Sequence, residues 1–312
     1  VVGLSSVQIG DGLGDLMEKQ HFHVVPTLRS RIIYDPTIHP KDMLACLKML
    51  EAEDPSLQVV WDKYFKSIYI HIMGKIQLEI LQKLIKERFQ YDVSFAQPEI
   101  LYKETITTPV IGCGHFEPLK HYAEVHLKLE PAPRGTGIIY ENKCHPDDLS
   151  IGHQNVIKQH LFERDHHGLL TGSRITDMKI SLLTGRAHPR HTQGGDFREA
   201  TYRALRQGLE QAENIILEPY YDFKIKVHMD YIGRVMADIQ KAHGTFSPME
   251  TNGDMAILKG RVPVATFLDY HETFTSFTQG KGILSFQFGG YDLCHNPDDV
   301  IAQISYDKDA DP

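Results

Sequence analysis

The stretch from Thr184 to Phe197, TGRAHPRHTQGGDF, gathers side chains that are suited to bind an anion. It contains two arginines and two histidines: Arg186, His188, Arg190 and His191. Although the chain carries a net charge of −8, no acidic residue occurs between Met178 and Gly195. Arginine pairs with phosphate and stacks on bases, whereas histidine can stack or hydrogen-bond without a permanent charge. These residue types suit contact with RNA. A solvated surface loop without a ligand explains them equally well.

The rest of this stretch fits a loop at an exposed tip. Thr192 and Gln193 follow the basic residues and are secondary candidates for RNA contact. Gly194 and Gly195 allow close approach of a backbone, and Pro189 stiffens the chain. Because an alternating run precedes the stretch and a run of helical periodicity follows it, we expect its residues to have no core face to occupy.

A second basic loop occurs at residues 112–125, with the sequence GCGHFEPLKHYAEV. His115, Lys120 and His121 are weaker candidates for RNA contact. Glu117 adds a negative charge and Pro118 stiffens the segment. A loop that only leads into a strand is as good an interpretation as RNA contact.

Signatures of catalysis are missing from the sequence. No GxxxxGK[ST] pattern occurs, and QGKG at 279–282 lacks the spacing of a phosphate loop. No GxSxG nucleophile pattern occurs either. We therefore predict no catalytic residues, and we predict that this chain neither binds nor hydrolyses GTP.

The chain has 18 histidines, which raises the question of a metal site. His166 follows His160 by six residues and adjoins His167, and His188 and His191 have an HxxH spacing. No HExxH motif occurs, and no cysteine lies near enough to complete a familiar zinc pattern. Histidines near a helix C-terminus also suit the helix dipole. The sequence therefore predicts structural or solvated histidines and no metal site.

Composition restricts the class of protein. A chain of 312 residues with 41% hydrophobic and 24% charged residues is typical of two or three globular domains. No apolar run is long enough to span a bilayer. Four scattered cysteines, without a CxxC, indicate a reducing cytoplasm: Cys46, Cys113, Cys144 and Cys294. We expect a cytoplasmic monomer without a membrane partner. Because the chain opens with VVGLSSVQIGDGLGD and not with Met, we expect a fragment of a longer protein.

Two parts of the chain predict the same order of elements. In the first, strands at 27–34, 57–61, 67–72 and 91–95 alternate with helices at 39–55 and 74–89 in a βαββαβ unit. In the second, strands at 218–228, 245–251, 254–263 and 281–290 alternate with helices at 229–244 and 264–274. Residues 296–304 predict a further helix.

The region between these units is predicted to be a mixed αβ domain. Val125, Leu127 and Leu129 alternate as in a half-buried strand. Residues 147–168 predict a helix that ends at Gly168, and the basic loop precedes a helix that starts at Asp196.

The expected fold class is α+β with three domains: two ferredoxin-like βαββαβ sandwiches flank a mixed αβ domain. The predicted ranges are 28–105, 106–214 and 217–304, with a tail at 305–312.

Eight short segments occur in the order found in the C-terminal domains of elongation factor G and its relatives. They are EAEDPSLQV, MGKIQLEI, QPEILYKETI, PAPRGTG, LEPYYDFKIKV, YIGRVMADI, GTFSPMETNGDMAILKGRVPVA and TQGKGILSFQF. The chain thus resembles domains III, IV and V of this family, and residues 1–27 resemble the end of the preceding β-barrel domain and a linker. The resemblance implies a ribosomal protein S5 domain 2-like fold for the middle domain. MGKIQLE favours the tetracycline-resistance ribosomal protection proteins, and His188 favours elongation factor G itself.

The resemblance implies a function for the basic loop. In the family, this loop is the far tip of domain IV and reaches the decoding region of the small ribosomal subunit, where it meets ribosomal RNA. The resemblance implies no cofactor in this chain, and GTP with Mg²⁺ in an N-terminal domain of the parent, a GTPase acting on the ribosome. The alternative is a stand-alone RNA-binding module or RNA-modifying enzyme with a histidine-rich site.

Overall fold

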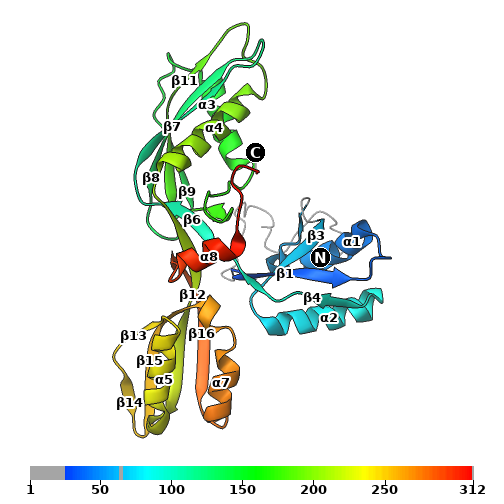
Figure 1. Cartoon of the computed structure of the whole chain (residues 1–312), viewed down its shortest axis with the longest axis vertical. Coiled ribbons are helices and arrows are strands. Elements are labelled where there is room, and N and C mark those ends of the chain that lie inside the picture. The colour runs from blue at the N-terminus through cyan, green and yellow to red at the C-terminus, as the bar shows by residue number, and fades with distance from the viewer. Residues whose placement is uncertain (1–24, 63–65, 311–312) are drawn as a thin grey trace, which may run out of the picture. The chain divides into compact units, whose positions relative to one another are not determined.

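The computed structural model describes residues 25–62 and 66–310 (Figure 1). These residues divide into two compact units, which are described separately. One unit comprises residues up to Leu101 together with Tyr221–Gly289, and the other comprises Tyr102–Tyr220 together with residues from Gly290 onward. The strands and helices together confirm a mixed α+β fold. The predicted barrel remnant at 1–27 lies almost wholly outside the described residues.

In the first unit, residues 28–95 form a βαββαβ arrangement. Its elements are β1 (Leu28–Tyr34), α1 (Pro40–Glu53), the 3-10 helix η1 (Pro55–Leu57), β2 (Val60–Asp62), β3 (Ser67–Ile72), α2 (Lys75–Phe89) and β4 (Val93–Phe95). The strands are antiparallel in the order β2-β3-β1-β4, and β5 (Glu99–Ile100) also pairs with β1. The alternation of β3 places Ile68, Ile70 and Ile72 in the core, where each is at most 1% exposed.

Helix α2 buries a narrower stripe than its sequence predicts. The helical period of the sequence predicts Ile76 and Ile80 on the apolar side of this helix, but they are 74% and 60% exposed. The buried residues are Leu78, Leu81 and Ile85, which follow one another at spacings of three and four. Because each residue turns a helix by 100°, this stripe faces the sheet and the two isoleucines lie beside it.

Residues 214–293 form a second βαββαβ order, with two interruptions that the sequence analysis did not predict. Its elements are β12 (Asn214–His228), α5 (Met229–Lys241), β13 (Thr245–Phe246), β14 (Glu250–Asn252), β15 (Met255–Pro263), α6 (Val264–Phe267), α7 (Tyr270–Phe277) and β16 (Ile283–Leu293). Strands β13 and β14 are separate because Pro248 between them has no backbone N–H to donate to a ladder. The last helix is likewise divided, into α6 and α7. Strands β12 and β16 contribute residues to both units.

The second unit contains the sheet that positions the basic loop. Its elements are β6 (Lys103–Ile106), β7 (Val110–Phe116), β8 (Ala123–Pro131), β9 (Ile138–Asn142), α3 (Ile151–Phe162), β10 (Arg174–Ile175), β11 (Met178–Ala187), α4 (Asp196–Gln211) and α8 (Pro297–Ile304). Four of these strands pair in the order β7-β8-β11-β9. The alternating residues Val125, Leu127 and Leu129 of β8 are fully buried, as predicted.

Two glycines allow helix α4 to pack directly on strand β7. A Cβ at Gly112 would lie 1.9 Å from the carbonyl oxygen of Ala204, and a Cβ at Gly114 would lie 1.8 Å from that of Ala200. No side chain fits in these gaps. The close contact fixes the N-terminus of α4, and with it the loop that leads into the helix.

Helix α3 ends at Phe162 and not at Gly168 as predicted. The following residues pair with the segment before β11 instead of continuing the helix. The Gly168 N–H donates to the Ser173 carbonyl, and the Ile175 N–H donates to the His166 carbonyl. These hydrogen bonds satisfy backbone groups that a longer helix would otherwise have used.

Candidate nucleic-acid interface

Two loops meet at one end of the β7-β8-β11 sheet, which lies at the top of Figure 1. One joins β7 to β8, and the other joins β11 to α4. Ala123 of β8 pairs with Phe116 of β7 and with Ala187 of β11, so both loops leave the sheet at the same level. Strand β11 extends through Arg186, which the sequence analysis assigned to the loop.

Thr192 joins the two loops. Its hydroxyl accepts a hydrogen bond from the His188 N–H at 2.7 Å and donates one to the Tyr122 carbonyl at 2.7 Å. The Tyr122 N–H in turn donates to the His191 carbonyl at 3.0 Å. Thr192 is half-buried, and its hydroxyl therefore holds the loop as well as being a candidate for RNA contact.

Asp196 is the second link between the loops. This residue is 3% exposed and lies in the first turn of α4, where the helix dipole favours a negative charge. One carboxylate oxygen accepts from the Gln193 N–H at 2.8 Å, and the other lies 2.8 Å from His121 Nδ1. Gly195 precedes it with φ +102°, a conformation that favours glycine. The sequence offers one signal for Asp196 that was not used: an acidic residue directly after a glycine pair, at a helix start where the dipole favours negative charge.

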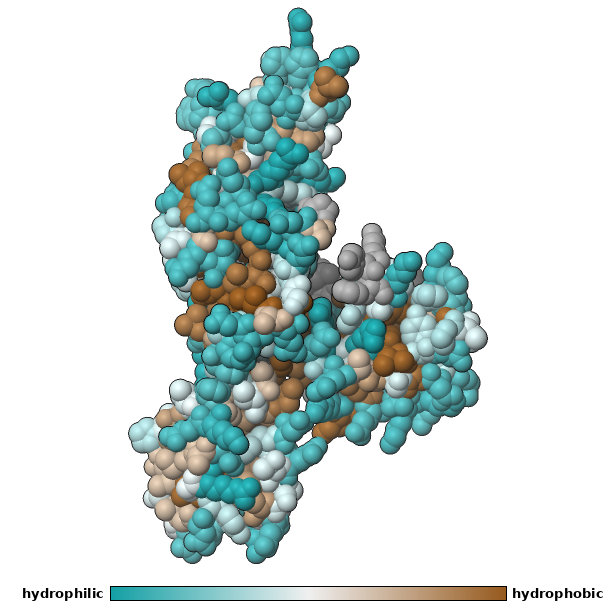
Figure 2. Space-filling model, viewed as in Figure 1, coloured by the Kyte–Doolittle hydropathy of each residue, from teal (hydrophilic) through white to brown (hydrophobic). Residues whose placement is uncertain are grey.

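The basic side chains of the tip remain available. Arg186, His188 and Arg190 are exposed. In the described part of the chain, no carboxylate lies within ion-pair distance of Arg186, Arg190 or Lys120. The rings of His188 and His191 lie 4.4 Å apart at an interplanar angle of 32°, so they present paired aromatic surface beside the arginines. Figure 2 shows mostly hydrophilic residues over this end of the unit.

The three weaker candidates have different surroundings. His115 lies 2.8 Å from Glu117, and its ring packs edge-on against Tyr122. His121 is bound to Asp196, as described above. Lys120 is exposed, with φ +63°, and stands as a third cation at the tip. Of the three, only Lys120 is therefore unengaged by a carboxylate among the described residues.

A small network below the tip carries a further negative charge. Glu124 accepts from Tyr122 at 3.0 Å and lies 2.6 Å from His126 Nε2. The His126 hydrogen bond is the main cause that lowers the pKa of the Glu124 carboxyl, and Arg186 contributes to the same direction. Glu124 therefore stays ionised at neutral pH and is already bonded to its neighbours.

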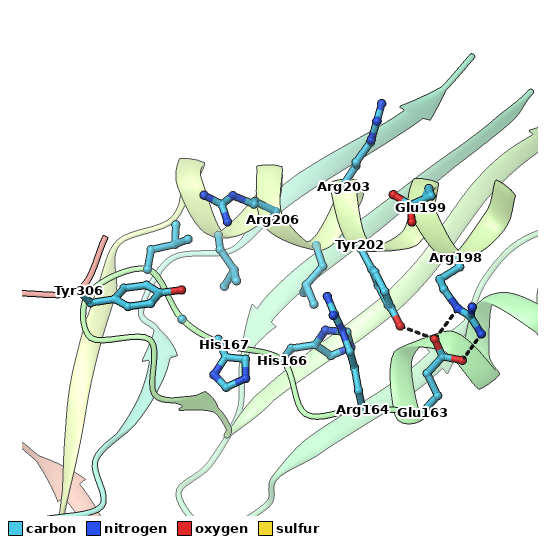
Figure 3. Close-up of a pocket in the computed structure, with 14 residues that line it drawn as sticks. Glu163, Arg164, His166, His167, Arg198, Glu199, Tyr202, Arg203, Arg206 and Tyr306 are labelled. Carbon is cyan, nitrogen blue, oxygen red and sulfur yellow. Dashed lines mark hydrogen bonds and ion pairs between the residues drawn. The ribbon is translucent and has the colours of Figure 1, made fainter. Parts of the chain in front are cut away.

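A second cluster of basic residues lines a hollow along α4 (Figure 3). Its polar lining residues are Glu163, Arg164, His166, His167, Arg198, Glu199, Tyr202, Arg203, Arg206 and Tyr306. The spacing of Arg198, Tyr202 and Arg206 is i, i+4, i+8, which places them on one helix face. This spacing is a signal that the sequence analysis did not use.

Glu163, at one side of this hollow, holds several of its polar groups (Figure 3). It accepts two hydrogen bonds from Arg198, at 2.7 and 3.1 Å, and one from the Tyr202 hydroxyl. His160 Nδ1 lies 2.9 Å from the same carboxylate. The Arg198 hydrogen bonds, followed by those of Tyr202 and His160, lower the pKa of Glu163 to about 2. The guanidinium of Arg164 lies 4.0 Å from the centre of the Tyr202 ring.

The histidines of the predicted alternative site bind neighbouring groups. His166 Nε2 lies 3.1 Å from the Leu161 carbonyl, and His167 Nδ1 lies 2.7 Å from the Gly172 carbonyl. Burial is the main cause that lowers the pKa of His166. Over residues 25–62 and 66–310, neither these histidines nor the pair at the tip belongs to a set of three metal-ligating side chains.

Comparison with family models covers most of the chain. Residues 32–97 match elongation factor G domain III, residues 98–213 match domain IV, and residues 215–300 match the C-terminus of elongation factor G. The chain carries elongation factor G family domains. The basic loop and the loop beside it both lie in the domain IV match.

Individual relatives agree with the family models. The tetracycline resistance protein TetP of Clostridium perfringens is 29% identical over 293 residues, which are 93% of this chain and 45% of TetP. Elongation factor G of Aquifex pyrophilus is 28% identical over 305 residues, which are 94% of this chain and 43% of that protein. The chain therefore spans less than half the length of these relatives.

A solved structure shares the fold of this chain. It is the crystal structure of a protein from Thermus thermophilus, with a TM-score of 0.71 and 22% identity. The match covers 92% of this chain and 44% of that one. In the described ranges, no helix combines the length and the apolar character that crossing a membrane requires.

Proposed function

We propose that this chain is the ribosome-binding part of a translational GTPase that resembles elongation factor G or a ribosomal protection protein. The observation that carries the proposal is the pair of loops at the end of the β7-β8-β11 sheet, where Arg186, Arg190 and Lys120 are exposed and form no ion pair among the described residues. The family match places this end in domain IV. The tip would contact ribosomal RNA in the decoding region of the small subunit.

Phosphate is the chemical group that best suits these cations. An exposed arginine gains little from a solvated carboxylate but releases counterions when it neutralises a phosphate. The stacked His188 and His191 rings could add contact with an unpaired base. Because Thr192 and Asp196 already hold the loop backbone, the tip needs little ordering before it binds.

The domain organisation belongs to the same proposal. Residues 28–105 and 217–304 would be ferredoxin-like sandwiches on either side of an αβ domain at 106–214 with a ribosomal protein S5 domain 2-like fold. The observed strand order β2-β3-β1-β4 supports this assignment for the first sandwich. GTP and Mg²⁺ would bind in another domain of the parent, in the cytoplasm, and these domains would act as a monomeric lever on the ribosome.

Ribosome co-sedimentation of the purified chain tests the contact. We expect the triple variant Arg186→Ala, His188→Ala, Arg190→Ala to bind ribosomes markedly more weakly than the wild type. The slope of log affinity against log salt should fall by roughly one unit for each lost phosphate contact. The free energy of unfolding should change by less than about 0.5 kcal/mol, because the substituted side chains are exposed.

A matched control removes two exposed lysines of the first unit, Lys41→Ala and Lys83→Ala. It subtracts the same permanent charge as the loss of two arginines, and ribosome affinity should change little. Equal loss in both variants would mean that net charge, not the tip, governs binding. Binding that an authentic elongation factor does not displace, or binding to naked RNA only, would contradict the proposal and favour a stand-alone RNA-binding module.

A further inference from the structure

Glu218 is a carboxylate with no exposure to solvent, near the start of strand β12 in the second unit. One of its oxygens accepts from the His295 N–H at 2.8 Å and lies 2.8 Å from His295 Nδ1. The Tyr220 hydroxyl lies 3.4 Å from the same oxygen. Its three polar neighbours therefore all lie on one side of the carboxylate.

The other oxygen of Glu218, Oε2, is buried and has no hydrogen-bond partner among the described residues. Buried carboxylate oxygens are nearly always bonded, because a desolvated and unpaired one costs several kcal/mol. Such an atom is open to a further hydrogen-bond donor or to a cation.

Two further metal-ligating residues lie beside this carboxylate. Cys294 and His295 connect the end of β16 to α8, and the Cys294 N–H donates to the Ile216 carbonyl of β12 at 3.1 Å. One ligand atom from each of Glu218, Cys294 and His295 lies within 4.8 Å of the other two. The three side chains are buried or half-buried, so solvent screens them little.

We propose that Glu218, Cys294 and His295 form a zinc-binding site, with water as the fourth ligand. A thiolate, an imidazole and a carboxylate are the ligand types that Zn²⁺ takes in tetrahedral sites. Bonds of about 2.0–2.3 Å place such ligand atoms about 3.3–3.8 Å apart. The three ligand atoms already lie within 4.8 Å of one another, so side-chain shifts can bring them to these separations around an ion.

The ion would join the C-terminal segment to the sheet. Glu218 belongs to β12, whereas the other two ligands precede α8, and 77 residues separate Glu218 from His295 along the chain. An ion between them would neutralise the unpartnered oxygen and cross-link these elements. The three ligands do not form a local spacing motif, because Glu218 is distant in sequence from Cys294 and His295. The sequence therefore predicted no metal site.

Zinc titration of the full 312-residue chain, stripped of metal with a chelator, tests the site. We expect one Zn²⁺ per chain in competition with a chromophoric chelator. Cobalt substitution should give thiolate-to-metal charge-transfer absorption. Zinc should also raise the melting temperature, because the ion binds the folded state.

The ligand variant is Cys294→Ser, which should weaken zinc binding by about 100-fold or more, since even outer-shell changes cost about 10–100-fold. The matched control is Cys113→Ser. Cys113 Sγ also lies 3.1 Å from a histidine, His126, which in turn lies 2.6 Å from Glu124. This surface set has the same residue types but no unpartnered oxygen, and the control should keep wild-type affinity.

Alkylation of the wild-type chain tests the site even if the Cys294→Ser variant does not fold. Zinc should slow alkylation of Cys294, but not of Cys113, as followed by mass spectrometry. Absence of stoichiometric zinc binding, loss of binding in Cys113→Ser, or equal alkylation of Cys294 with and without zinc would each overturn the proposal. The site is independent of ribosome binding, so its failure leaves the proposed function untouched.

Discussion

Two carboxylates in the second unit, Asp196 at the tip and Glu163 in the α4 hollow, act on their basic neighbours in opposite ways. Asp196 is buried and bonds the Gln193 backbone and His121, so it holds the two loops together. The Glu163 carboxylate instead bonds the side chains of Arg198, Tyr202 and His160. Neither Arg186 nor Arg190 forms an ion pair in the described part of the chain, although Arg186 lies opposite Glu124 in the β8-β11 pair, whereas Arg198 is paired with Glu163.

The number of basic residues at a site therefore does not measure the capacity of that site to bind an anion. The hollow has more arginines than the tip, but one of its carboxylates neutralises Arg198, and Arg164 stacks on Tyr202. At the tip, the Asp196 carboxylate bonds the Gln193 backbone N–H and His121, and no arginine. Cations without local partners are therefore expected to lose least when they transfer to phosphate.

The largest effect on stability is expected at Asp196. Asp196→Ala should lower the free energy of unfolding by about 1–3 kcal/mol, because buried groups bonded to the carboxylate lose their partner. Asp196→Asn keeps an acceptor oxygen and should lose less. Urea denaturation measures both. Equal stability of Asp196→Ala and wild type would show that the loops do not depend on this carboxylate.

A smaller loss is expected for Thr192→Val, which keeps the shape but removes the hydroxyl that bonds His188 and Tyr122. The expected decrease is about 0.5–1.5 kcal/mol. Hydrogen exchange at the His188 amide should also become faster. Thr192→Ser is the control, since it retains the hydroxyl. Slow exchange in the valine variant would refute a role for Thr192 in holding the loop.

The smallest effect is expected for Glu163→Gln, since solvent-accessible ion pairs contribute about 0–1 kcal/mol. The way in which this stability difference depends on pH tests whether the neighbours of Glu163 hold it ionised. The pKa of Glu163 falls from 4.5 to about 2 on folding, so the carboxylate stabilises the fold above about pH 4.5. The advantage of wild type over Glu163→Gln should vanish as pH falls towards about 2.

Thermal melts between neutral pH and the folded-state pKa of about 2 measure this difference. Arg198→Ala removes the main partner of Glu163 and should remove much of the same pH dependence. A constant difference between wild type and Glu163→Gln over the whole range would mean that Glu163 is not held ionised by its neighbours.

Much of the fold follows from the sequence alone, because strand and helix periodicities are local. Alternation located β3 and β8, whose alternating residues are buried. The helix predicted at 39–55 is present as α1, with Pro40, a residue that suits the first turn, at its start. Family motifs in sequence order indicated elongation factor G domains, and the family models confirm them. The exposure of Arg186, His188 and Arg190 also followed, whereas Thr192 is half-buried, contrary to the expectation that the whole loop has no core face to occupy.

Tertiary structure decided what local pattern could not. Which face of α2 is buried depended on the position of the sheet, so Ile76 and Ile80 are exposed despite their apolar character. The end of α3 depended on pairing with residues 173–175. The contact of His121 with Asp196 joins residues that are 75 positions apart. Which residues carry charge can therefore be read from the sequence, and most of the elements near them follow from local pattern, whereas long-range contacts decided which charges are paired and which remain available to a ligand.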